Sequence, residues 1–395
     1  MKSRNGITRR DFLKKVGLAT TVATFGCATA ETPKPEKASA IVTQSEPIVY
    51  PKLSNNKVQA PEKGCFIGFN KFYVPVNDPV FIGKQMDMAK RARNIDEYVE
   101  IAKKENIMGS IDIEGLVSNN IGYYEKAIGA KPSIYVLYDT PRLYLNFPMR
   151  EAEAVAKNGV LPYINALPGS TMLKSLRFGL DEIVSGKRDS YLIKFAQGAT
   201  EFGKKHGGFF MTTMEENNGY WYYWGQSSTF IPAWRHIWQV FEDQGANQYA
   251  TWVWEPSCLE PSARLDIAKM QPPEKYYPGD THVDWIGLSA FSRKGSHGDG
   301  MLFEGLIHKT YAEMRKNHPQ KPIMQAETGK SQMWDQSKWL IDAYKTIKSM
   351  PGLKAAIYWD NVTTISIPAD DKTLSDKSLQ TLKEIFKDPY WIMAK

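Results

Sequence analysis

The chain has 395 residues, of which 42% are hydrophobic and 24% are charged, with 29 Gly, 23 Pro and 3 Cys. This composition excludes a collagen-like repeat, a small domain built on disulfides and a fully disordered chain. The formal net charge is +7, but residues 1–30 hold six Lys and Arg against one Asp, which leaves +2 for the rest. So small a net charge gives no long-range attraction to a polyanion, and nucleic acid is therefore not an expected partner.

The first thirty residues have the pattern of an export signal. Arg9 and Arg10 form a twin-arginine pair, and an apolar stretch from Val16 to Phe25 follows. That stretch is too short to cross a membrane as a helix, and Ala28-Thr29-Ala30 after it has the small-x-small form that signal peptidase cleaves. We predict a twin-arginine signal peptide over residues 1–30, with the twin-arginine export machinery as a partner.

Two locations remain open for the exported protein. Gly26-Cys27 resembles the end of a lipoprotein signal, and a lipid on Cys27 would anchor the protein to a bacterial membrane. Cleavage after Ala30 would instead release a periplasmic or secreted protein. Residues 31–60 are rich in Pro, Lys, Glu, Ser and Asn without a sustained apolar period, which predicts a flexible linker.

From residue 61 the chain alternates short β-rich runs with amphipathic helical segments. The predicted strands are Cys65–Phe69, Ser133–Tyr138, Val160–Ala166, Gly208–Met214, Ala250–Trp254, Val283–Ser289, Pro322–Glu327 and Lys354–Trp359. Between them the pattern predicts helices at Ile95–Lys104, Met149–Lys157, Tyr191–Lys205, Ile231–Asp243, Phe303–Lys316 and Ser337–Ser349. Buried strands that alternate with helices are typical of a parallel sheet, so residues 61–395 are predicted to form one α/β domain, a (β/α)8 TIM barrel. A long excursion is expected between Asn70 and Lys131.

Two of the predicted strands lead into glutamates. The fourth is followed by Glu215 and Glu216, and the seventh ends at Glu327. Active sites of such barrels lie where the strands end, and retaining glycoside hydrolysis uses two carboxylates about 5–5.5 Å apart. We predict Glu216 and Glu327 as a catalytic pair.

Aromatic residues are concentrated just after Glu216, and indole rings stack well on the flat C–H faces of sugars. Trp234 and Trp238 are four residues apart and are expected to belong to a helix core, whereas Trp221 follows the glutamate in a loop. The predicted substrate contacts are Trp221, Trp224, Trp254, Phe291, Trp359 and Glu215.

Several segments together resemble glycoside hydrolase family 26, the β-mannanase family, over roughly residues 125–392. Glu216–Gly225 (ENNGYWYYWG) resembles the acid/base loop of that family, Val283–Gly287 resembles its sixth strand, and Lys321–Gly329 resembles its nucleophile strand. The resemblance implies a (β/α)8 barrel and a retaining, endo-acting hydrolase. It also implies Glu216 as the acid/base, Glu327 as the nucleophile and β-1,4-mannan as the first substrate to consider.

Three positions depart from the family pattern. Glu215 stands where many members carry His, Thr212 where they often carry Arg, and Phe291 where a Tyr usually hydrogen-bonds to the nucleophile. Losing the Arg and the Tyr hydroxyl removes support for an anionic nucleophile. The departures leave open a related β-glucanase or β-xylanase, a weakened enzyme, or an exported carbohydrate-binding lipoprotein that does not cleave.

Other chemistries find no support in the sequence. There is no paired His motif and no G-x-G-x-x-G segment, so neither a metal nor a cofactor is expected. Cys65 and Cys258 remain in the mature chain, and their spacing does not say whether they pair. The protein is expected to act on its polysaccharide as a monomer.

Overall fold

The computed structural model describes residues 53, 56–71, 87–88, 90–105, 112–138, 146–169, 177–259, 267–292, 301–332, 334–361 and 371–394. All of them belong to one compact unit, residues 43–395. The predicted signal peptide, Cys27 and most of the predicted linker lie outside the described residues.

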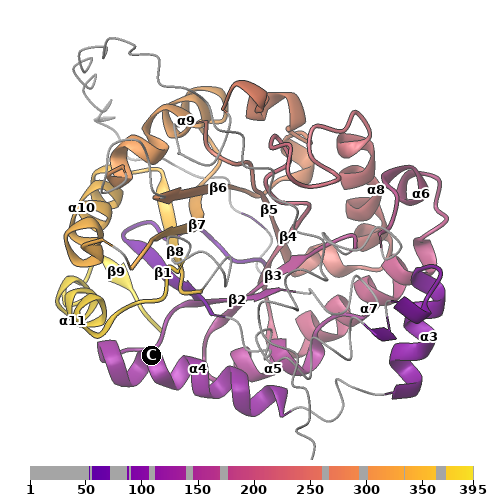
Figure 1. Ribbon diagram of the computed structural model, residues 1–395, viewed down its shortest axis with the longest axis horizontal. Coiled ribbons are helices and arrows are strands. Elements are labelled where there is room, and N and C mark those ends of the chain that lie inside the picture. Colours follow the sequence, from indigo (N-terminus) through magenta and orange to yellow (C-terminus); the bar gives the residue numbers. More distant parts are fainter. Residues whose placement is uncertain are drawn as a thin grey trace, which may run out of the picture. The chain divides into compact units, whose positions relative to one another are not determined.

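Eight parallel strands in the described part of the chain close into a barrel (Figure 1). They are β1 (Cys65–Asn70), β2 (Ile134–Tyr138), β3 (Leu161–Ala166), β4 (Phe209–Thr213), β5 (Ala250–Trp254), β6 (Trp285–Ser292), β7 (Ile323–Lys330) and β8 (Leu353–Trp359). Neighbours pair in chain order from β2 to β8, and β1 pairs with both β8 and β2, which closes the ring. The predicted TIM barrel is confirmed.

Helices surround the ring of strands in Figure 1. They are α3 (Ile95–Glu105), α4 (Ile113–Ile128), α5 (Met149–Lys157), α6 (Leu180–Val184), α7 (Asp189–His206), α8 (Phe230–Asp243), α9 (Phe303–Asn317), α10 (Gln336–Ser349) and α11 (Asp376–Ile385). Short 3-10 helices lie at Ala246–Gln248, Ile267–Lys269, Pro273–Tyr276 and Asp280–His282. None of the described helices is both long and apolar enough to span a membrane.

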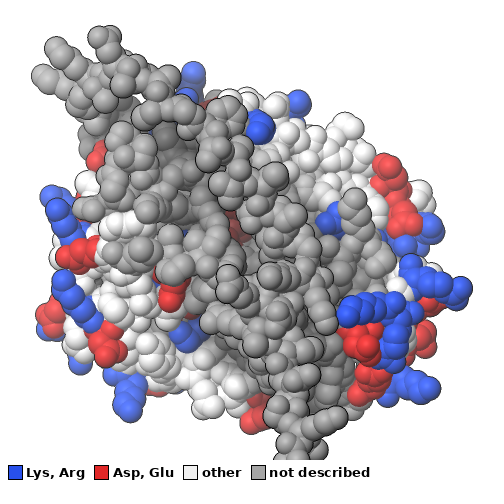
Figure 2. Space-filling view, in the orientation of Figure 1, with Lys and Arg blue, Asp and Glu red and all other residues white. Residues whose placement is uncertain are grey.

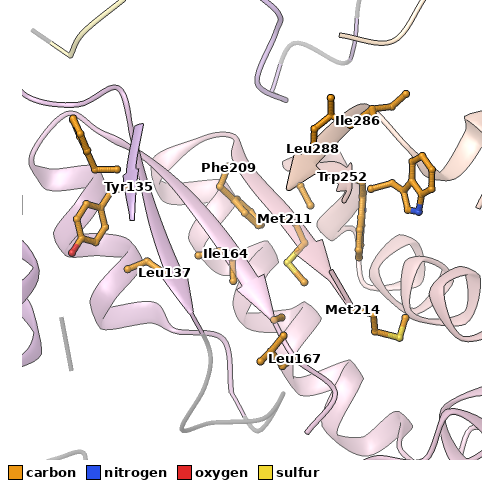
Figure 3. Close-up of a cluster of buried hydrophobic side chains, with 14 of the residues drawn as sticks. Tyr135, Leu137, Ile164, Leu167, Phe209, Met211, Met214, Trp252, Ile286 and Leu288 are labelled. Carbon is orange, nitrogen blue, oxygen red and sulfur yellow. The ribbon is translucent and has the colours of Figure 1, made fainter. Parts of the chain in front are cut away.

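The strands bury two different faces, because successive side chains of a strand point to opposite sides of the sheet. One set fills the inside of the barrel: Val58, Ile134, Val136, Tyr163, Phe210, Val253, Trp285, Met324, Ala326, Ala355 and Ile357. The other set faces the helices and includes Leu137, Ile164, Met211 and Trp252, which are drawn in Figure 3. The interior is tightly filled, since a Cβ on Gly68 of β1 would lie 2.9 Å from Ile357 Cγ1.

The N-terminal end of the barrel is closed by segments from both ends of the unit. Val58 lies within the inner cluster, and its backbone N–H donates to Thr251 Oγ1 at 2.8 Å. Lys57 forms an ion pair with Asp284 at 2.7 Å. Residues 56–60, which the sequence assigned to the flexible linker, therefore belong to the barrel. A ninth strand, β9 (Trp391–Ile392), pairs with the start of β1.

Candidate active site

The chain turns sharply after β4, and this turn carries Glu215 and Glu216. Met214 and Glu216 both have φ of 52°, a left-handed conformation that residues other than glycine seldom adopt. Such a conformation costs on the order of 1 kcal/mol or more and persists only where its surroundings impose it. Here it leaves Glu215 buried and Glu216 half-buried.

A buried asparagine holds this turn against the segment after β5. Asn218 Nδ2 donates to the Ser257 carbonyl oxygen at 2.9 Å, and Asn218 Oδ1 accepts from the Ser257 backbone N–H at 2.8 Å. The loop then folds back closely on itself, because a Cβ on Gly225 would lie only 2.2 Å from the Gly219 carbonyl oxygen. The ENNGYWYYWG sequence thus supplies both the side-chain bonds and the small residues that this loop requires.

Three hydrogen bonds fix Glu216. Trp221 Nε1 donates to its Oε2 at 2.6 Å, and Ser289 Oγ donates to its Oε1 at 2.7 Å. Its own backbone N–H donates to the Glu255 carbonyl oxygen at 2.7 Å. Ser289 lies on β6 directly beside Glu327 of β7 in the strand register, and neighbouring strands are about 4.8 Å apart. The structure therefore brings Glu216 and Glu327 to the same part of the barrel mouth.

Glu327 lies within β7 rather than at its end. The strand continues to Lys330, and a bulge at Ala326 shifts the register, so that Leu288 pairs with Gln325 while Ser289 pairs with Glu327. Bulges of this kind re-aim side chains. Glu327 is only 7% exposed, and its Oε1 has no hydrogen-bond partner among the described residues. Burial raises the pKa of Glu327 to about 8, although the positive charge of Lys372 opposes that rise.

Two more carboxyls, those of Glu215 and Glu255, are buried beside Glu216. Tyr163 donates its hydroxyl to Glu255 Oε2 at 2.7 Å. Burial raises the pKa of Glu255 to about 8, with the Glu216 charge adding to the effect and the Tyr163 hydrogen bond opposing it. Burial, followed by the charge of Glu255, raises the pKa of Glu215 well above its usual range. Both carboxyls therefore favour the neutral form at neutral pH.

The aromatic residues predicted to bind substrate fall into two groups. Phe291 and Trp359 lie edge to face at the mouth, with their ring centroids 6.0 Å apart, and Tyr138 of β2 meets Trp359 at 5.5 Å. Trp221 is half-buried beside Glu216. These positions are compatible with contacts to a ligand at the barrel mouth.

Trp224 and Trp254 belong to the core instead, which corrects their assignment to the binding set. Both are 0% exposed. Trp254 follows the inward-facing Val253 on β5 and so points toward the helices, where it meets Tyr277. Trp224 donates its Nε1–H to the Glu215 carbonyl oxygen at 2.8 Å and stacks on Tyr222. Neither indole offers a face to a sugar.

Sequence reasoning missed four residues of this site: Glu255, Tyr163, Ser289 and Lys372. Glu255 could have been predicted from the sequence, because it directly follows the fifth predicted strand, just as Glu216 lies shortly after the fourth. Cys65 and Cys258, whose pairing the sequence left open, are both buried and are not joined by a disulfide. No group of three His, Cys, Asp or Glu side chains in the described ranges could hold a metal ion.

Comparison with known proteins identifies the family. The model of Glycosyl hydrolase family 26 matches residues 183–392, just over half of the chain. The chain belongs to glycosyl hydrolase family 26. The matched part contains β4 to β9 and thus both Glu216 and Glu327.

Individual relatives are distant from this family 26 chain. Endoglucanase H of Acetivibrio thermocellus is 26% identical over 220 residues, which are 53% of this chain but only 22% of that protein. The family 26 domain of an endo-β-mannanase/endo-β-glucanase from Prevotella bryantii aligns with a TM-score of 0.54 and 11% identity, over 84% of this chain and 91% of that one. A β-mannanase from a symbiotic protist of the termite Reticulitermes speratus aligns with a TM-score of 0.53 and 14% identity, over 89% of this chain and 97% of that one. At such identities these two structures support the barrel fold alone.

Proposed function

We propose that this family 26 chain is a retaining, endo-acting glycoside hydrolase that cleaves a β-linked polysaccharide by double displacement. The observation that carries the proposal is the Ser289 hydrogen bond, which holds the Glu216 carboxyl beside the strand position of Glu327. In the first step Glu327 attacks the anomeric carbon while Glu216 gives a proton to the leaving oxygen. In the second step Glu216 takes a proton from water. The water oxygen attacks the anomeric carbon, and the bond from that carbon to Glu327 breaks, which releases the Glu327 carboxylate.

The surrounding residues support these roles. Trp221 and Ser289 each hold one oxygen of Glu216, so the carboxyl keeps one orientation through both steps. Glu215 and Glu255 favour the neutral form, so they add little negative charge against the ionisation of Glu327.

β-1,4-Mannan is the substrate we propose first, with β-glucan and β-xylan as alternatives. The family 26 domain from Prevotella bryantii comes from a protein named for both mannan and glucan, and the termite symbiont protein is named a β-mannanase. A neutral polymer also suits the described part of the face in Figure 2, where acidic and basic side chains are interspersed.

The test is product release from β-1,4-mannan, mixed-linkage β-glucan, β-1,3-xylan and β-1,4-xylan by the purified chain. We expect cleavage of one polymer to be lost by several orders of magnitude in Glu327→Ala and kept in Glu182→Gln, a change on the outer surface. Proton NMR of the first product should show the anomeric configuration of the substrate. Turnover that survives Glu327→Ala, or an inverted product, contradicts the proposal.

A non-catalytic carbohydrate-binding barrel is the second candidate. The raised pKa of Glu327 favours it, because a neutral carboxyl is a poor nucleophile. Oligosaccharide affinity that is the same in wild type, Glu216→Gln and Glu327→Gln, with no product from any polymer, would support this alternative.

We also propose export by the twin-arginine route, with residues 1–30 as the signal and a tether that ends before residue 56. The support is the Arg9-Arg10 pair and the apolar stretch after it. Replacing both arginines with lysine should leave the chain in the cytoplasm, whereas Cys27→Ala should abolish only a membrane anchor. Export that is unchanged by the double replacement contradicts this route.

A further inference from the structure

A buried lysine, Lys372, interacts with Glu327 from the segment between β8 and α11. Three hydrogen bonds fix the backbone of this segment. The Tyr358 hydroxyl donates to the Lys372 carbonyl oxygen at 3.0 Å, and the Lys372 N–H donates to the Asn361 carbonyl oxygen at 3.1 Å. Two residues on, the Leu374 N–H donates to Asp360 Oδ1 at 2.6 Å. The position of Lys372 is therefore set by the barrel itself.

The side chain of Lys372 runs across the mouth of the barrel. It is 0% exposed, and its Nζ lies 5.1 Å from the centroid of the Phe291 ring. Its stem packs on β7, because a Cβ on Gly329 would lie 3.0 Å from Lys372 Cδ. Gly329 and Glu327 are two residues apart on β7 and so share one face of the strand. The ammonium group is held over an aromatic face on the same side of β7 as the carboxyl.

Other charged groups at this end of the barrel have their own described contacts. They are Lys330 against Ser292, Lys71 paired with Asp360, Asp371 with Thr373, and Glu216 and Glu255 with the donors given above. Glu215 is buried and favours the neutral form. Among the described residues, Lys372 is the charged group that acts on Glu327, and it lowers the pKa that burial raises. Phe291 supplies a ring face there but no hydrogen-bond donor.

We propose that Lys372 is a positioning residue for the reaction, the buried countercharge that favours the ionised form of the Glu327 carboxyl. This inference rests on the proposed role of Glu327 as the nucleophile. A nearby positive charge stabilises an anion most where water is excluded, and burying an ammonium group is itself costly unless a carboxylate lies close to it. Each group thereby offsets the cost of burying the other.

The experiment compares the full-length chain with Lys372→Met, which keeps the length of the stem and removes the charge, and Lys372→Arg, which keeps the charge. Lys354→Met is the matched control, because Lys354 is also buried but lies near the start of β8 and contacts the Glu62 carbonyl oxygen. The readout is the ionisation of Glu327, followed by carbon-13 NMR of labelled glutamate carboxyls, with its signal identified by its loss in Glu327→Gln. The acidic limb of kcat/KM is recorded in parallel.

We expect Lys372→Met to raise the Glu327 pKa by about one unit or more, and thus to lower kcat/KM at pH 7 about tenfold relative to wild type. Lys372→Arg should keep most of the wild-type value, and Lys354→Met should not change it. If Lys372→Met does not fold, Gly329→Ala takes its place, because its new Cβ crowds the lysine stem and should shift the titration in the same direction. An unchanged Glu327 titration in a folded Lys372→Met or Gly329→Ala protein overturns the inference. Absence of turnover in wild type would count against the proposed function, while the NMR titration would still decide the role of Lys372.

Discussion

Glu327 and Glu255 are both buried carboxyls whose pKa is about 8, yet their surroundings differ. Glu255 accepts a hydrogen bond from Tyr163 and interacts with the carboxylate of Glu216, whereas Glu327 interacts with the ammonium group of Lys372. Removing a carboxyl from water favours its neutral form, and a partner of opposite charge reverses part of that effect. Strongly shifted groups of this kind are typical of functional sites.

The raised pKa of Glu327 sets the pH range in which the proposed nucleophile ionises. Below pH 8 Glu327 is mostly protonated, so its ionised fraction should rise about tenfold per pH unit toward pH 8 and level off above it. The measurement is the carbon-13 NMR titration of the Glu327 carboxyl from pH 5 to 10. Glu182→Gln should leave the profile unchanged, and a plateau already reached by pH 6 would contradict the expectation.

Glu255 should make the fold less stable as the pH rises. Its folded pKa of about 8 lies above the ordinary value of 4.5, so the folded state holds a proton that the unfolded state releases. The stability that this proton provides is fully present below pH 4.5 and is lost as the pH rises through 8. Glu255→Gln cannot ionise, so its stability relative to wild type should increase between pH 5 and pH 9, by about 4 kcal/mol.

Urea denaturation of both proteins at the two pH values measures this difference. Glu182→Gln is the control, because ion pairs with Lys187 and Arg188 lower the pKa of Glu182 to about 2. Its contribution to stability is therefore constant between pH 5 and pH 9. Parallel curves for Glu255→Gln and wild type would mean that Glu255 is not buried in the neutral form.

At the scale of elements, the loops after β4 and β5 act as one unit. Asn218 ties them together through both the N–H and the carbonyl of Ser257, and it also donates to the Gln271 carbonyl oxygen at 3.2 Å. This unit imposes the left-handed conformation on Glu216. The orientation of Glu216 therefore depends on the Asn218 side chain, which bonds to the backbone of the neighbouring loop.

Asn218→Ala should lower both stability and turnover. Removing a buried amide leaves its partners without hydrogen bonds, at about 1–3 kcal/mol for each unsatisfied group, and frees Glu216 to leave its orientation. We expect about 3 kcal/mol of lost stability and a fall in kcat at unchanged KM. Asn158→Ala is the control, since the Asn158 side chain donates to Ser118 and to the Ala154 carbonyl oxygen, among the helices and away from the barrel mouth. A variant at Asn218 with lost stability but normal kcat would show that the loop unit is purely structural.

The sequence pattern located most elements, because buried strands and amphipathic helices follow from local periodicity. The bounds of α5 agree to the residue, whereas β7 extends three residues beyond its predicted end, across a bulge that periodicity does not encode. The helix α4 was not predicted, although Asp112 and Gly129 cap it and Val117 and Ile121 lie on its buried face. Ser289 and Lys372 could not be assigned, because their roles depend on contacts between segments far apart in the chain.

At the scale of the whole molecule, the two ends of the barrel have different tasks. Glu216, Glu327 and Lys372 lie at the end where the strands finish, whereas residues 56–60 and β9 pack at the end where they begin. Trp391 of β9 pairs with Cys65 and packs against Tyr344 and Tyr390. In such barrels chemistry belongs to the first end and stability to the second.

Trp391→Ala should therefore separate stability from catalysis. Trp391 is 6% exposed, and truncating a buried tryptophan costs about 3–5 kcal/mol, so the variant should unfold at clearly lower urea concentration. Its kcat/KM and the acidic limb near pH 8 should match wild type at temperatures where it is folded, because no charged group near Glu327 has moved. Lys372→Met, in contrast, should shift the pH profile itself. A shifted acidic limb in folded Trp391→Ala would mean that the ionisation of Glu327 depends on the packing of the whole barrel rather than on its local countercharge.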